Sequence, residues 1–113
     1  PSARGWPGGL SPQQAVLAYA QLLGIEQPSV HIEPLLSLCE AHRLPLPALP
    51  PAAVEANVGA LSTSRLVEAR VVGAHALAKG GDVVALERLR ASDPSAVVQA
   101  VARSFLVSRV GIL

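Results

Sequence analysis

Apolar side chains recur at intervals of three and four residues along most of the chain, and no stretch shows sustained alternation of apolar and polar positions. The first spacing gathers apolar side chains on one face of a helix, whereas alternation would indicate a half-buried strand. Gly and Pro residues interrupt the pattern and mark the ends of the helices. The sequence therefore predicts an all-α protein of five or six short helices, either an irregular bundle or a short stack of helical hairpins.

The N-terminal part of the pattern begins with residues 1–9, which are rich in Gly and Pro and are predicted to form an irregular tail. A first helix is predicted over residues 12–23, because Ser11 is a favourable N-cap and Gln14 can complete a capping box. Gly24 is expected to stop this helix. The side chains predicted to face inward are Ala15, Val16, Tyr19, Leu22 and Leu23.

A second helix is predicted over about residues 30–43, followed by a connector over residues 44–51 that contains four prolines. Proline at this density forces an extended backbone. Pro51 or Ala52 then opens a third, short helix that is predicted to run to about Ala60.

The C-terminal half is predicted to hold three further helices. The first runs from possible N-caps at 62–65 to about Lys79, the second covers 83–91, and the third runs from 94 to about 109. Glycines at 80 and 81 stop the first helix, Asp82 caps the second, and Asp93 before Pro94 caps the third. The side chains predicted to face inward are Val83, Leu86 and Leu89, and then Val97, Val98, Val101, Ala102 and Phe105. Those predicted to face outward are Glu87, Arg88 and Arg90.

One glycine lies in the middle of a predicted helix, where it costs about 1 kcal/mol of helix propensity relative to Ala. Ala69, Gly73 and Leu77 share one helical face. We expect another helix to cross closely over Gly73 and recover this cost, the alternative being a tolerated glycine on the surface.

Composition supports a single helical domain over residues 1–113 with one core. Ala, Leu and Val dominate, while Phe, Trp and Tyr occur once each, and small aliphatic side chains suit closely packed helices. A single cysteine, Cys39, excludes an intramolecular disulfide and favours a reducing, intracellular environment. No uncharged apolar run is long enough for a transmembrane helix, so no membrane insertion is expected. Because the chain begins with Pro1 and not Met, we expect an upstream part to be missing.

Side chains that could carry catalysis are few. Cys39 and His42 lie one helical turn apart and His31 could approach them, but structural zinc needs four ligands. No metal site is therefore expected, and Cys39 is interpreted as a buried hydrophobic residue. His75 has no carboxylate one turn away to orient it, so a structural or exposed histidine is expected. The carboxylates form no recognisable catalytic pattern and no phosphate-binding loop is present. The sequence thus predicts neither an enzyme nor a cofactor.

Two short motifs have competing interpretations. Residues 47–50 form a P-x-x-P sequence, but no basic residue stands at the spacing of an SH3 ligand, so a structural connector is favoured. Ser92 follows two arginines and could be phosphorylated by a kinase that prefers upstream arginine. It could equally cap the loop before Pro94, which is the interpretation we favour.

Residues 66–89 resemble one helical hairpin of the tetratricopeptide or pentatricopeptide type. Small residues occupy the first helix, glycines form the turn, and Ala85 is placed to pack back against it. The aromatic positions of those repeats and a second copy at their period are absent, so we assign no membership.

The absence of catalytic groups in an apolar helical chain indicates a non-catalytic protein-protein interaction domain, a part of a larger protein or complex. Trp6 is expected either to strap the tail to the helices or to contact the partner. The alternative function is nucleic-acid binding through the C-terminal arginines, which a hairpin could bring onto one side. Acidic residues among them and the lack of interleaved aromatic residues make that alternative weaker. The candidate partner-binding residues are Trp6, Arg88, Arg90, Arg103 and Arg109.

Overall fold

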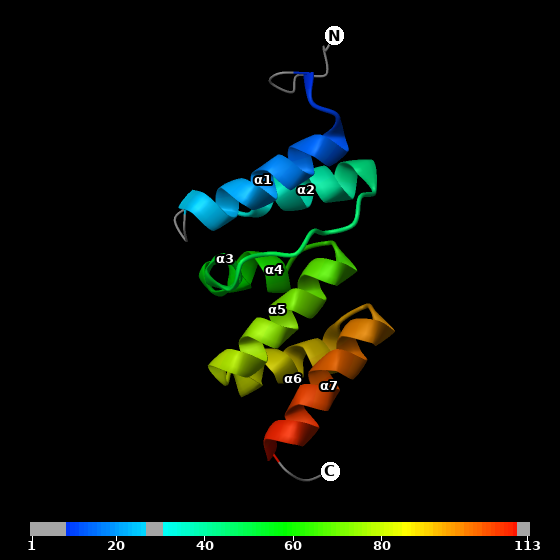
Figure 1. The fold of residues 1–113 in the computed structure, drawn as a ribbon. Coiled ribbons are helices and arrows are strands. Elements are labelled where there is room, and N and C mark those ends of the chain that lie inside the picture. Colours follow the sequence, from blue (N-terminus) through cyan, green and yellow to red (C-terminus); the bar gives the residue numbers. More distant parts are fainter. Residues whose placement is uncertain (1–8, 27–30, 111–113) are drawn as a thin grey trace. The chain divides into compact units, whose positions relative to one another are not determined.

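The structure, a computed structural model, describes residues 9–26 and 31–110, with the side chains of residues 24–26 and 109–110 outside this description. All regular structure in these ranges is helical, which confirms the predicted fold class (Figure 1). The seven helices are α1 (Pro12–Glu26), α2 (Glu33–His42), α3 (Pro51–Ala56), α4 (Val58–Ser62), α5 (Val67–Gly80), α6 (Val83–Ser92) and α7 (Ala96–Val110).

The helices divide into two compact units, an N-terminal unit over Pro1–Asn57 and a C-terminal unit over Val58–Leu113. The N-terminal unit contains α1, α2 and α3, and the C-terminal unit contains α4 to α7. The expectation of one core shared by residues 1–113 stays a prediction.

Helix α1 begins with the predicted capping box. The backbone N–H of Ser11 donates to Oε1 of Gln14 at 2.9 Å, and the N–H of Gln14 donates to the Ser11 hydroxyl at 3.2 Å. Val16 and Leu23 are buried as predicted, but Leu22 is 40% exposed. The helix continues through Gly24 to Glu26, so the prediction that Gly24 would stop it is wrong. A glycine favours a helix end without imposing one, because it is also tolerated inside a helix at modest cost.

Helix α2 packs against α1 within the N-terminal unit (Figure 1). It starts later than predicted and carries Pro34 in its first turn, where the missing N–H has no cost. It ends at His42, and the next residue, Arg43, adopts a left-handed conformation with φ of 54°. The connector that follows has no regular structure up to Pro50, as predicted.

The predicted helix from Pro51 to about Ala60 is interrupted at Asn57. Helix α3 ends at Ala56, and α4 begins at Val58. Asn57 has φ of −123°, outside the helical range, and is buried. Its side-chain amide donates to the Ala53 carbonyl at 2.8 Å, which gives the backbone acceptor an alternative to the helical ladder. This break accounts for the extra helix relative to the prediction.

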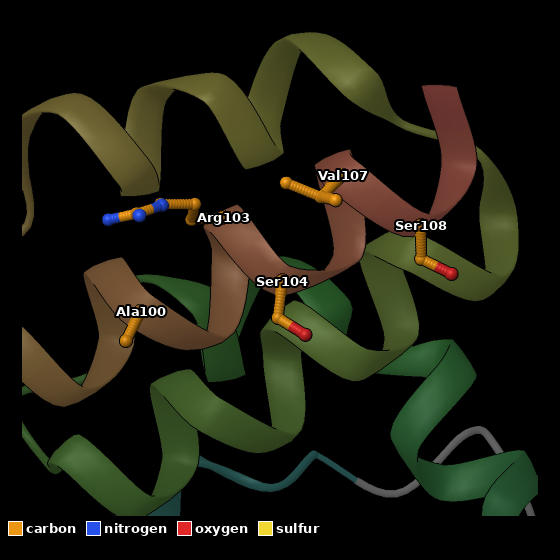
Figure 2. A pocket seen from close by; sticks show the side chains of 5 residues that line it. All are labelled: Ala100, Arg103, Ser104, Val107 and Ser108. Atoms are coloured by element: carbon orange, nitrogen blue, oxygen red, sulfur yellow. The ribbon is translucent and has the colours of Figure 1, made fainter. Parts of the chain in front are cut away.

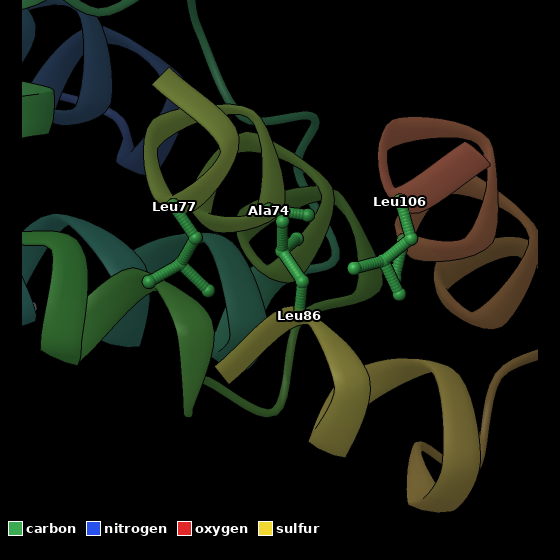
Figure 3. Close-up of a cluster of buried hydrophobic side chains, with 5 residues drawn as sticks. Ala74, Leu77, Leu86 and Leu106 are labelled. Atoms are coloured by element: carbon green, nitrogen blue, oxygen red, sulfur yellow. The ribbon is translucent and has the colours of Figure 1, made fainter. Parts of the chain in front are cut away.

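The core of the C-terminal unit lies where α5, α6 and α7 meet. Figure 3 shows Ala74 and Leu77 of α5 with Leu86 of α6 and Leu106 of α7. Ala102 of α7 completes this buried cluster. Helices α6 and α7 form an extensive mutual contact, and α5 packs against both. Small and branched aliphatic side chains fill the cluster, as the composition indicated.

Gly73 marks a close crossing of α4 and α5, as predicted. A Cβ atom at this position would lie 2.8 Å from both the Cα and the backbone N of Ser62, and 3.1 Å from the carbonyl carbon of Leu61. The obstructing atoms are backbone atoms, so they cannot move aside by a change of rotamer. Gly73 is therefore required by packing at this crossing.

The helix ends of the C-terminal unit follow local sequence signals in part. Gly81 ends α5 in the left-handed conformation, with φ of 76°. The Asp82 carboxylate accepts a hydrogen bond from the N–H of Ala85 at 3.0 Å, confirming the predicted cap of α6. Helix α7 differs, because the hydroxyl of Ser95 accepts from Val97 and Val98 at its start. Ser95 thus takes the capping position that the sequence assigned to Asp93.

Asp93 instead forms a buried ion pair with Arg70 of α5. Nε of Arg70 lies 2.8 Å from Oδ2 of Asp93, and a second guanidinium nitrogen lies 3.2 Å from Oδ1. Arg70 also donates to the Ser64 carbonyl at 2.7 Å, and Asp93 Oδ1 accepts from the N–H of Ser95. The side chain of Gln99 donates to the Asp93 carbonyl. These bonds tie the start of α5 to the junction of α6 and α7.

Candidate protein-binding surfaces

The outward face of α7 is the first candidate surface. The buried side chains of this helix, Val98, Ala102 and Leu106, occupy one side, and the exposed side chains occupy the other. Val97 is 58% exposed and Val107 is 36% exposed. The prediction that Val97 faces inward is wrong, and Leu106 takes the inward place that the sequence reasoning missed. An apolar side chain is available on both sides of α7, so periodicity alone could not choose between them.

A shallow hollow follows this face along Ala100, Arg103, Ser104, Val107 and Ser108 (Figure 2). Figure 2 shows these five side chains on the one helix. A neighbouring hollow is lined by Arg90 of α6 and by Ala96, Gln99, Ala100 and Arg103 of α7. The two hollows share Ala100 and Arg103, so they form one continuous surface, which we call the α7 face.

The charges on the α7 face are one-sided. Helix α7 contains no Asp or Glu. Arg90 is engaged by Glu87 within α6, at 3.0 Å from Nε and 2.7 Å from a second guanidinium nitrogen. This hydrogen bond, reinforced by the charge of Glu87, raises the pKa of Arg90 above its usual value. Arg103 is exposed and has no side-chain partner within the part of the chain that the structure describes.

A second candidate surface is an open hollow lined by residues from the end of α4, from α5 and from α6, which we call the Arg88 hollow. Its apolar lining is Leu77, Ala85 and Leu89. The hydroxyls of Ser62, Thr63 and Ser92 line it as well, and its charged residues are Arg88 and Asp93. It has a volume of about 240 Å³.

The structure brings only some of the predicted arginines together. Arg90 and Arg103 line one hollow of the α7 face, but Arg88 lines the other surface. Two residues of separation place Arg88 and Arg90 about 200° apart around α6. The possibility that a hairpin brings all four arginines onto one side therefore does not hold for Arg88. The side chain of Arg109 and the whole of Trp6 lie outside the described residues.

The remaining polar candidates lie in structural positions. Cys39 is buried, as expected, it forms no disulfide, and its thiol donates to the Pro45 carbonyl at 3.8 Å. His75 is exposed and meets Phe105 edge to face, with ring centroids 4.8 Å apart. Partial burial, and secondarily the charge of Glu33, raises the pKa of Tyr19, whose hydroxyl donates to the His31 carbonyl.

Within residues 9–26 and 31–110, no three His, Cys, Asp or Glu side chains are grouped to hold a metal ion. None of the helices in this part of the chain is both long and apolar enough to cross a membrane.

The predicted inward face of α6 is confirmed only in part. Val83, predicted to face inward, is 38% exposed, while Leu86 is buried as predicted.

Comparison with known proteins gives no relative: no protein family, no curated protein and no solved structure matches this chain. The assignment of a function therefore rests on the surfaces alone.

Proposed function

We propose that this chain is a non-catalytic helical domain that binds another protein through the α7 face, as an intracellular part of a larger protein or complex. The observation that carries the proposal is the composition of that face. It combines the exposed Val107, small side chains and an arginine without a carboxylate partner in the described part of the chain, and the exposed Val97 lies on the same helix beside it. Outward helix faces are normally covered by charged side chains of both signs, whereas α7 carries no acidic side chain and exposes two valines, as a helix that contacts another protein would.

The chemistry of the partner follows from the same residues. Ala96, Ala100, Ser104 and Ser108 recur every four residues, so a partner element can approach the α7 backbone closely. Arg103 lies within this surface and would bind a carboxylate of the partner, with Val97 and Val107 supplying apolar contact on either side. A partner that presents aliphatic and small residues with one acidic residue would fit.

Site-specific photo-crosslinking tests the proposal. A photoreactive phenylalanine derivative at Ala100 or at Ser104 should form an adduct with the same protein in cells of the source, identified by mass spectrometry. The same amino acid at Ala91, which is exposed on α6 and lines neither surface, is the matched control.

The partner is then purified and its affinity measured. We expect Arg103→Glu to weaken binding at least about tenfold, because a repulsive charge replaces a pairing one. Arg43→Glu makes the same change in charge in the N-terminal unit and should leave the affinity unchanged. Equal affinity for the chain with Arg103→Glu and the unmodified chain would overturn the proposal.

Nucleic-acid binding is the alternative function. The separation of Arg88 from Arg90 and Arg103 weakens its support, because contiguous phosphates require a continuous basic surface. The pairing of Arg90 with Glu87 further reduces the net positive charge of the surface.

A further inference from the structure

The Arg88 hollow is distinct from the α7 face and has its own chemistry. Leu77, Ala85 and Leu89 line it, and all three belong to or pack against the core cluster of the C-terminal unit. Side chains that take part in a packed core have little freedom to rearrange. The apolar part of the hollow is therefore held in place before any ligand arrives.

Apart from Arg88, each polar side chain that lines the hollow either has a hydrogen-bond partner already or carries no charge. Asp93 is paired with Arg70 and accepts from the N–H of Ser95. The hydroxyls of Ser62 and Thr63 both donate to the Gly59 carbonyl, at 3.3 and 2.7 Å. Arg88 is exposed and has no ion pair or side-chain hydrogen bond among the described residues. A ligand would thus meet one free cationic donor beside an apolar surface.

The size of the hollow indicates the kind of occupant. Pockets for drug-sized ligands and cofactors enclose roughly 300–1,000 Å³. The Arg88 hollow, at about 240 Å³, lies below that range. Hollows of this size suit single anchoring side chains, which contribute much of the affinity of protein-protein interfaces when they fill a preformed site.

We propose that the Arg88 hollow receives one aliphatic side chain of a partner protein, while a carboxylate next to that side chain in the partner binds Arg88. The inference rests on the proposed function, because the ligand is again a partner protein, but the surface that binds it is a different one. The aliphatic side chain contacts Leu77, Ala85 and Leu89, and the adjacent carboxylate forms a charge-assisted hydrogen bond with the guanidinium.

The test is a titration followed by ¹H–¹⁵N NMR, which detects millimolar binding and locates it. The probe is a tetrapeptide with blocked ends that contains leucine followed by aspartate. We expect saturable shifts in the backbone amides of Thr63, Ala85 and Leu89 and in the side-chain Nε–H of Arg88.

Two control peptides separate the contribution of the carboxylate from that of the aliphatic side chain. Replacing aspartate by asparagine in the peptide should weaken binding about threefold, as for an ion pair that stays partly exposed. Replacing leucine by alanine should weaken it about tenfold, because most of the apolar contact is lost.

A pair of variants assigns the effect to this hollow. Arg88→Gln should abolish the preference for the aspartate peptide over the asparagine peptide, whereas Arg103→Gln should retain it. Absence of saturable shifts, or an unchanged preference in the chain with Arg88→Gln, would overturn the inference. So would 4-methylpentanoate binding as tightly as the peptide, which would indicate a small-molecule occupant.

These outcomes are separable from those of the crosslinking experiment. A partner crosslinked at the α7 face together with an unresponsive Arg88 hollow would leave the proposed function standing and remove only this second surface. Peptide binding at the hollow without any adduct at Ala100 or Ser104 would support the Arg88 hollow and count against the α7 face.

Discussion

Arg70 and Asp93 lie 23 residues apart in the chain and form a two-point ion pair whose side chains are only 11% and 3% exposed. The same guanidinium binds the Ser64 carbonyl, and the same carboxylate binds the N–H of Ser95. Both charged groups of the pair thereby have further hydrogen bonds besides those they make with each other. Such a pair is costly to break from one side, because the remaining charge stays buried without its partner.

Removing one member of this pair should destabilise the protein strongly. We expect Asp93→Asn to lower the free energy of unfolding by about 3–5 kcal/mol, the range for a buried pair that loses one partner. Urea unfolding followed by circular dichroism measures the change. Arg90→Gln disrupts the exposed pair with Glu87 and is the control, expected to leave the urea midpoint unchanged. Equal midpoints for both variants would show that the Arg70–Asp93 pair contributes nothing.

Substitution of Gly73 should be unfavourable even by Ala, the best helix former. The new Cβ would overlap backbone atoms of Ser62, and overpacking of this kind costs roughly 1–3 kcal/mol. Gly73→Leu should cost more. Gly80→Ala in the same helix is the matched control, since apart from its chain neighbours and the backbone of its own helix no atom lies within 4 Å of its Cβ position. It should be neutral or stabilise by up to about 1 kcal/mol. Thermal unfolding of the three variants tests this contrast, and an unchanged melting temperature for Gly73→Ala would refute the crossing.

The capping role at the start of α7 can be tested with two serines that lie close together. Ser95→Ala removes the acceptor for the N–H groups of Val97 and Val98, so we expect a loss of about 1 kcal/mol. Ser92→Ala should change stability by less than about 0.5 kcal/mol, because this exposed serine makes no side-chain hydrogen bond with described residues. Denaturant unfolding distinguishes the two, and a larger loss for Ser92→Ala would reverse the assignment.

We expect no measurable binding of mixed-sequence DNA or RNA at physiological salt. Each neutralised phosphate would give a slope of about −0.9 in a plot of log affinity against log salt, so even four contacts would be evident. Fluorescence anisotropy over a series of salt concentrations provides this measurement. Sub-micromolar binding with a steep slope, abolished by the combined change Arg88→Ala and Arg103→Ala, would instead support the nucleic-acid alternative.

Local sequence signals predicted several helix ends, although they failed at Gly24 and at Asp93. The capping box of Ser11 and Gln14, the cap by Asp82 and the stop at Gly81 depend on residues a few positions apart, and all are present. The orientation of α7 was wrong at Val97 because aliphatic residues occur around much of that helix.

The candidate surfaces required the tertiary structure. Asp93 has the local pattern of an N-cap, but its carboxylate is oriented toward Arg70, a distant residue that no periodicity or motif connects to it. Arg88 and Arg90 also lie only two residues apart in the sequence, yet they line different hollows, and no local pattern reveals this difference.

The crossing at Gly73 also constrains how this sequence can diverge over evolution. Where two side chains collide, a smaller residue at one position can compensate for a larger one at the other. Here the obstacle is the Ser62 main chain, which every substitution at residue 62 retains. Position 73 therefore has no partner with which to covary, and descendants of this sequence should keep its glycine whichever side chain occupies position 62.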